Sequence, residues 1–205
     1  MSPRGVAIPD LRERLFAAAE RVVALSGAAA LTSRAVTDEA QCAKGVLHAH
    51  FTGLDEFVAA LVLDRFSRSA RGAEALAGLV GRGTVADNLV DFAAALLDSL
   101  DPAVVGLAMT RPAASLHTRR ALEAGEPGFA AMQESVAGYL EAEREAGRVP
   151  RGADPHILAL ALVGTVHHLL MTRSPDAGFD ARATCGRLVT ALLGTPGGTP
   201  GGSPA

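Results

Sequence analysis

Signals that start helices recur along this chain, and they constrain its fold more than any other feature. A residue that can open a helix stands three positions before an acid, or directly before a proline, again and again. The stretches between these signals place apolar residues at i, i+3, i+4 and i+7, the spacing of one helix face. Runs of β-branched residues bounded by turns are scarce, so we predict an all-α fold with about nine helices. The signals are Asp10 with Glu13, Thr32 on its own, Thr52 with Asp55, Thr84 with Asp87, Asp101-Pro102, Glu126-Pro127 and Asp154-Pro155.

The overall charge gives no sign of a nucleic-acid partner. The formal net charge is −3 at pH 7, and the first 66 residues hold seven bases against eight acids. Any contact with DNA must therefore come from the local placement of charge and from helix N-termini, rather than from a basic field around the domain.

Several features indicate a soluble, cytoplasmic protein with no membrane partner. The N-terminal sequence MSPRGVAIPD lacks the apolar region of a signal peptide. The longest apolar stretch, Ile157 to Met171, contains His167 and His168 and is shorter than the ~20 residues of a membrane span. The cysteines Cys42 and Cys185 lie far apart and outside any CxxC pattern, which suits a reducing compartment.

The order and length of the predicted helices indicate two domains. Three short helices, over about residues 10–27, 32–40 and 44–49, precede a long helix that starts near Thr52. This is the outline of a helix-turn-helix domain. We predict a helix-turn-helix domain over residues 1–53, a larger helical domain over 54–194, and a disordered Gly/Pro-rich tail over 195–205.

Six residues of the predicted helix-turn-helix keep a distinctive spacing: Thr32, Ala40, Gly45, Leu47, His50 and Phe51. This spacing resembles that of the tetracycline-repressor (TetR) family of transcriptional regulators, whose segments read roughly T-x-x-x-I-A-x-x-A-G-V-s-x-G-x-L-Y-x-H-F. The resemblance covers about the first sixty residues and implies an operator-binding regulator. The remaining helices are similar to that family only in number and length.

Three positions depart from the family pattern. The glycine of the turn is Gln41, which would cost about 1–2 kcal/mol if a left-handed backbone is kept there. The family's tyrosine is His48, and the lysine at the start of its fourth helix is Leu54. By resemblance both of these family residues contact phosphate, so their loss should weaken binding to every DNA sequence and flatten its salt dependence.

The candidate DNA-binding residues follow from the needs of a recognition helix. Its N-terminal end must be small or polar to enter the major groove, as Ala43, Lys44 and Gly45 are. Lys44 suits a guanine edge or a phosphate, and a plain solvated lysine is the alternative. Hydroxyls and N–H groups at the start of the second helix can hold phosphate, although Thr32 also serves as a cap. The full set is Thr32, Ser33, Arg34, Ala43, Lys44, Gly45, His48 and His50, with His48 either charged near phosphate or simply exposed, and His50 either structural or a phosphate partner.

By resemblance, the C-terminal helices enclose a ligand pocket and the last two form a dimer interface. The stretches 157–171 and 179–193 are apolar on more than one face, which also favours a homodimer. The expected ligand is small and apolar. The candidate ligand-binding residues are Phe92, Met109, Phe129, Met132, Tyr139, Thr165 and His168, and ordinary core packing is the alternative for most of them.

Chemistry beyond binding is not indicated. His167 and His168 are adjacent, so they point about 100° apart on a helix and cannot hold one ion from one face. We expect no metal, no cofactor and no catalysis, because no catalytic triad, phosphate loop or paired-carboxylate spacing stands out.

The sequence leaves three hypotheses for the function. The first is a repressor that a small ligand releases from its operator. The second is a ligand-binding or interaction protein that keeps the fold but has lost specific DNA binding, as Gln41, Leu54 and the acidic N-terminal segment suggest. The third, an all-helical enzyme, has only an unassigned pocket in its favour.

Overall fold

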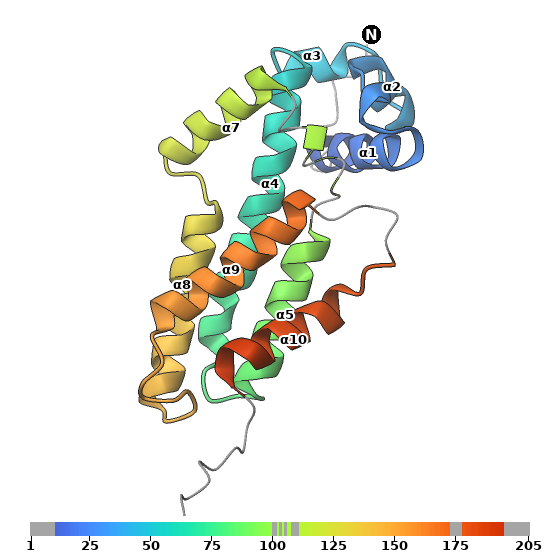
Figure 1. Ribbon diagram of the computed structural model, residues 1–205. Helices are drawn as coiled ribbons and strands as arrows, with labels where there is room; N and C mark the ends of the chain where they lie inside the picture. Colours follow the sequence, from blue (N-terminus) through green and yellow to red (C-terminus); the bar gives the residue numbers. More distant parts are fainter. Residues whose placement is uncertain are drawn as a thin grey trace, which may run out of the picture. The chain divides into compact units, whose positions relative to one another are not determined.

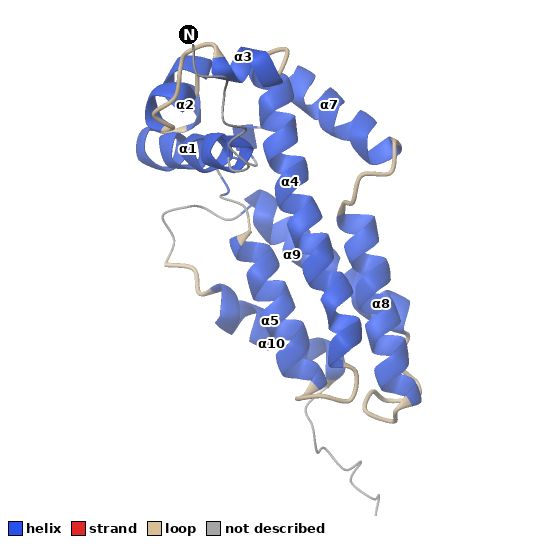
Figure 2. Ribbon diagram, turned by 180° about the vertical axis from the view of Figure 1, so that it is seen from behind, coloured by secondary structure: helices blue, strands red, loops and turns tan. Residues whose placement is uncertain are grey.

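The computed structural model describes residues 11–99, 102, 104, 106–107, 111–172 and 178–194, and within them the chain is entirely helix and loop, without a strand (Figures 1 and 2). These residues contain nine α-helices, which agrees with the predicted number of about nine. Asp10, Asp101, Met109 and the tail over 195–205 lie outside the described residues. The elements are α1 (Leu11–Ser26), η1 (Ala28–Ala30), α2 (Ser33–Glu39), α3 (Val46–His50), α4 (Leu54–Ala75), η2 (Leu76–Leu79), α5 (Val85–Asp98), α7 (Pro112–Glu123), α8 (Phe129–Glu145), α9 (Pro155–Thr172) and α10 (Ala181–Leu193).

Three of the predicted caps are confirmed. The hydroxyl oxygens of Thr32 and Thr84 each accept the N–H of the residue three positions later, both at 3.0 Å. The carboxylate of Asp154 accepts the two N–H groups that follow Pro155, at 2.9 and 3.2 Å. These bonds satisfy N–H groups that have no partner inside the helix, so they fix where α2, α5 and α9 begin.

The acids of two predicted capping boxes have other partners. Glu13 pairs with Arg65, and the Asp10 side of its predicted box lies outside the described residues. Thr52 donates from its N–H and hydroxyl to Glu56, at 2.7 and 2.5 Å, instead of pairing with Asp55, because α4 begins one residue later than that box requires. The hydrogen bonds from Thr52 lower the pKa of the Glu56 carboxyl below its ordinary value.

Two helix boundaries also differ from the prediction. The third helix begins at Val46 rather than near Lys44, with Gly45 as its cap residue. Pro112 was expected only to break the chain, but it occupies the first turn of α7, where a missing N–H costs nothing.

Contacts divide the described residues into two units. Unit 1 comprises residues 11–67, the described positions between 102 and 107, 111–127 and 170–172, and unit 2 comprises residues 68–99, 128–169 and 178–194. Helix α4 contributes its first part to unit 1 and its last part to unit 2. The boundary expected between residues 53 and 54 stays a prediction.

The core of unit 1 is an aromatic cluster between α1, the end of α3 and α4. Phe57 lies 5.5 Å from Phe16 and 5.2 Å from Phe51 between ring centroids, and all three rings are buried. The guanidinium of Arg12 covers the outer side of the cluster, 5.2 Å from the Phe16 centroid and 5.6 Å from that of Phe51. This cluster packs the helix-turn-helix against α4.

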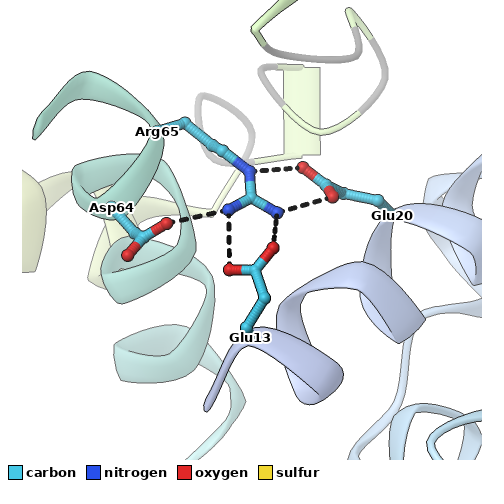
Figure 3. Close-up of polar contacts among 4 residues, drawn as sticks. All are labelled: Glu13, Glu20, Asp64 and Arg65. Atoms are coloured by element: carbon cyan, nitrogen blue, oxygen red, sulfur yellow. Dashed lines mark hydrogen bonds and ion pairs between the residues drawn. The ribbon is translucent and has the colours of Figure 1, made fainter. Parts of the chain in front are cut away.

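A buried arginine joins α1 to α4 beside that cluster (Figure 3). The guanidinium of Arg65 is only 8% exposed and donates to Glu20 at 2.9 and 2.7 Å, to Glu13 at 3.2 and 3.4 Å, and to Asp64 at 2.8 Å. Hydrogen bonds to Glu20 above all, against the effect of burial, raise the pKa of Arg65 further above its ordinary value. The side chain therefore stays charged and ties two turns of α1 to one position of α4.

Unit 2 contains α5 beside α10, and α8 against η2 (Figures 1 and 2). The fully buried carboxylate of Glu143 accepts the N–H of Gly81 at 3.1 Å and lies 3.3 Å from Arg148, which in turn donates to the carbonyl of Gly83. This ion pair fastens α8 to the loop between η2 and α5. A buried charge needs such compensation.

Two further features of unit 2 bear on the sequence predictions. Helix α9 has the length and mean hydropathy of a membrane span, by composition alone, and buried core helices of soluble proteins have the same properties. Cys185 is fully buried; burial first, and the charge of Asp98 second, raise the pKa of its thiol to about 11. This thiol therefore stays protonated and unreactive at neutral pH.

The Arg65 cluster predicts a specific loss of stability. Replacing Arg65 with Met should lower the free energy of unfolding by roughly 3 kcal/mol, the low end for breaking a buried ion pair, because the carboxylates left behind are partly exposed. Urea denaturation followed by circular dichroism measures this loss. Arg71→Met, on an exposed position of the same helix, should change stability by at most about 0.5 kcal/mol. Equal losses in the two variants would contradict the role given to Arg65.

Candidate nucleic-acid interface

Helices α2 and α3 form a helix-turn-helix whose inner sides are fixed by a few buried residues. Val36 and Thr37 of α2 are fully buried, and so is Leu47 of α3. The hydroxyl of Thr37 donates to the carbonyls of Ser33 and Arg34, at 3.1 and 3.0 Å, so a polar group lies in this core without losing its hydrogen bonds. The opposite sides of both helices are left to solvent.

The turn between the two helices has a left-handed residue. Gln41 has a φ of 53° and is the one non-glycine residue with positive φ in the part of the chain that the structure describes. Its N–H donates to the carbonyl of Asp38 at 3.1 Å, and Arg14 of α1 donates to the carbonyl of Ala40 at 2.8 Å. The turn therefore keeps the backbone that the TetR pattern fills with glycine, and the side chain of Gln41 makes it strained.

The predicted DNA-binding residues lie on the outer surface of this motif. Seven of the eight are exposed, and only Ser33 is half-buried. Ala43, Lys44 and Gly45 form the approach to α3 rather than its first turn, and His48 and His50 lie on the helix itself. Thr32 caps α2, so its hydroxyl already accepts one N–H group.

The acids near this surface are engaged by basic partners. Asp38 pairs with Arg34 at 3.4 Å, across two side chains that are 75% and 55% exposed, and Glu39 pairs with Arg21 of α1 at 2.6 Å. Exposed pairs of this kind are weak and screened by salt, so phosphate can compete for Arg34. Leu54, at the position of the family's lysine, is half-buried at the start of α4. The fixed cations on the outer side of the motif are Arg34 and Lys44.

The predicted ligand-binding residues that the structure describes all belong to unit 2 and differ in burial. Met132 is fully buried, Thr165 is half-buried and His168 is exposed. The ring of Phe129 stacks on His167, with centroids 4.2 Å apart.

Tyr139 is 2% exposed and belongs to a polar network inside unit 2. Its hydroxyl accepts a hydrogen bond from Asn88 at 2.9 Å, and burial above all, with a contribution from Glu143, raises its pKa. Sequence reasoning missed this network, because Asn88 lies 51 positions away.

Three of the surface grooves in the described residues bear on the predicted sites. One, of about 320 Å³ in unit 2, lies between the end of α4, η2 and α5, and Phe92 is the predicted ligand residue that lines it. A second, of about 370 Å³ in unit 1, is lined by polar side chains that include Arg12, Glu56 and His117. The third, also about 320 Å³, lies beside Gln41, between α1 and the turn. No group of three His, Cys, Asp or Glu that could hold a metal occurs among the described residues.

The strained turn makes a prediction about stability. Replacing Gln41 with Gly should raise the free energy of unfolding by about 1 kcal/mol, because glycine adopts positive φ without steric cost. Chemical denaturation measures the change. Gln41→Ala is the matched control, since it removes the same polar group but keeps the Cβ atom, and it should bring no gain. A gain of the same size in both variants would show that the backbone is not the cause.

The sequence matches no family model and no curated protein. Solved structures, in contrast, match most of the chain. A protein from Mesorhizobium loti described as a TetR-family transcriptional regulator is 18% identical, with a TM-score of 0.63 over 92% of this chain and 96% of that one. The transcriptional regulator FadR from Bacillus subtilis, solved with stearoyl-CoA, is 14% identical, with a TM-score of 0.62 over 89% and 97%.

A third similar structure is the ketosteroid transcriptional regulator KstR2 of Mycobacterium tuberculosis, which is 17% identical with a TM-score of 0.56 over 93% of this chain and 95% of that one. At such identities the likeness concerns the fold. It spans the helix-turn-helix and the helices that follow it. The chain therefore has the fold of the TetR-family transcriptional regulators, the family that its residues 32–51 resemble.

Proposed function

We propose that this protein is a TetR-type transcriptional regulator that binds operator DNA through α2, α3 and the turn between them. The observation that carries the proposal is the outer surface of this motif, where Arg34 and Lys44 are exposed beside small residues at the entry of α3. A short, unobstructed helix start of this kind can approach base edges in the major groove, while the arginine holds phosphate. The role is non-catalytic, in a soluble cytoplasmic protein.

A homodimer is part of the proposal. One face of α9 is buried through Ala159, Leu162, Val163 and Val166, while the other leaves Ile157 58% and Leu160 50% exposed, followed by Gly164 and His168. A second copy packed on this face would remove its apolar surface from water. Two copies related by a twofold axis would also present two recognition helices to half-sites about 34–36 Å apart.

The ligand we propose is small and apolar, and it acts on unit 2. The groove lined by Phe92 and the core residues Met132 and Tyr139 lie in that unit. One protein of the same fold is named for ketosteroids, and another was solved with stearoyl-CoA, which carries a long apolar acyl chain on a charged coenzyme A group. Such a ligand would release DNA only if it binds more tightly to the conformation that does not fit the operator.

A second function is favoured by specific residues. The strained Gln41, the half-buried Leu54 and the acidic balance of the N-terminal segment fit a ligand-binding protein that has lost its operator. Both functions predict a folded, ligand-binding unit 2. They differ in whether purified protein binds one DNA sequence in preference to others.

Lys44 gives the test of DNA binding. With duplex DNA from the flank of its own gene, Lys44→Ala should weaken binding roughly tenfold and lower the slope of log affinity against log salt by about one, since one phosphate contact is lost. A salt series of electrophoretic shifts measures both. Arg151→Ala removes the same charge from an exposed position of unit 2 and should leave both unchanged. No sequence-selective shift at low salt from folded protein would favour the second function.

The same test can be made without a mutation, because Lys44 is the only lysine in the chain. Acetylation removes its charge, whereas reductive methylation keeps it. Both reagents also modify the N-terminal amine, whose charge acetylation removes and methylation keeps, so the Lys44→Ala variant treated with the same two reagents is the control for that amine. We expect the acetylated protein to lose affinity and the methylated protein to keep most of it.

The exposed face of α9 gives the test of the dimer. Leu160→Glu should convert a dimer into a 20.9 kDa monomer in sedimentation equilibrium, because a charge would be buried in the apolar contact. Leu116→Glu changes a similarly exposed leucine of α7, 45% exposed, and should leave the dimer intact. A dimer that survives Leu160→Glu would place the contact elsewhere.

A further inference from the structure

Two histidines on α3 have no partner within the part of the chain that the structure describes. His48 and His50 are both exposed, and neither makes a hydrogen bond or an ion pair with any described residue. The five-residue helix that carries them buries Leu47 on its inner side. Its outer side therefore offers two imidazole rings to solvent, next to the proposed DNA contact Lys44.

The acids on the neighbouring elements are already engaged. On α2, Asp38 pairs with Arg34 and Glu39 with Arg21. In the first turn of α4, Asp55 pairs with Arg111, and Glu56 accepts two hydrogen bonds from Thr52.

Arg12, the nearby charged residue of α1, also has partners, since its guanidinium covers the rings of Phe16 and Phe51. Lys44, just before α3, is a cation and would not favour a second positive charge beside it. Within the described residues, the acids of these neighbouring elements thus pair with other groups rather than with His48 and His50. An external anion would be the first to stabilise their protonated rings.

We infer that this chain binds its operator with uptake of protons at His48 and His50, so that its DNA affinity rises as the pH falls. The inference rests on the proposed function, because the anion it invokes is the phosphate of the DNA backbone. An imidazole becomes charged between about pH 8 and pH 5, and the charged ring donates from both nitrogens where the neutral ring donates from one. Phosphate next to the ring favours the charged form.

The direction of the effect follows from which form binds. Near pH 8 the motif has two fixed cations on its outer side, Arg34 and Lys44. Near pH 6 protonation of His48 and His50 would add up to two more. The added affinity for DNA is therefore fully present at low pH. It is lost as the pH rises and the DNA-bound imidazole rings release their protons. Each added phosphate contact steepens the salt dependence by about 0.9.

The experiment is a fluorescence-anisotropy titration of the full chain with labelled duplex from the flank of its gene, near pH 6 and near pH 8, each across a salt series. We expect the dissociation constant for DNA to be roughly tenfold lower near pH 6 than near pH 8. This is the change expected if the complex binds one proton about tenfold more tightly than the free protein does. The slope against log salt should be steeper there by about one to two. The double variant His48→Gln, His50→Gln should lose both differences.

His117→Gln is the matched control, because His117 is an exposed histidine of the same unit, on α7. It should keep the pH dependence of the unchanged protein. Circular dichroism at both pH values shows whether each variant is folded. If the double variant keeps the full pH dependence, or if operator binding is the same at both pH values, the proton linkage is wrong while the proposed function stands. Absence of sequence-selective binding at every pH overturns both.

Discussion

The helix-turn-helix of this protein depends on one buried charge. Arg65 lies between α1 and α4 with three carboxylates around its guanidinium, and every bond that it makes crosses to α1 or to its own neighbour Asp64. The adjacent phenylalanine cluster supplies apolar contact, which has little directional preference, whereas the two-pronged bonds to Glu13 and Glu20 fix α1 at one register along α4. Because α1 also holds the end of α2 through Arg14, the angle of the recognition turn follows from this attachment.

Local signals in the sequence predicted most helix starts, and tertiary partners explain the exceptions. Thr32, Thr84 and Asp154 cap their helices as their neighbours in the sequence require. Asp55 does not close the predicted box, because α4 begins one residue later than that box requires, and its carboxylate pairs with Arg111, which is distant in sequence. The same reason separates the two candidate sites. The helix-turn-helix is one continuous segment, so spacing alone places its residues on one surface. The ligand residues come from several helices, and whether they meet depends on packing that no local pattern contains.

The departures from the family pattern become intelligible together. Gln41 keeps the left-handed turn at a cost in stability, so the geometry of the motif is retained although its glycine is not. Two of the family's phosphate contacts are replaced, one by the half-buried Leu54 and the other by the exposed His48. The outer surface of the motif has few side chains that are always charged, and two histidines that carry a charge only when they are protonated. A regulator built in this way would rely on the chemistry of its surroundings more than on a basic field.

Tyr139 gives the protein a built-in optical reporter. It is the single tyrosine of a chain that has no tryptophan, and its ring lies almost fully buried in unit 2. Its hydroxyl accepts a hydrogen bond from Asn88, so the tyrosine fluorescence of the entire molecule arises from one phenol in one hydrogen-bonded setting. A molecule that enters unit 2 and disturbs this network alters the emission without any label, whereas an event confined to unit 1 leaves the ring in its original surroundings.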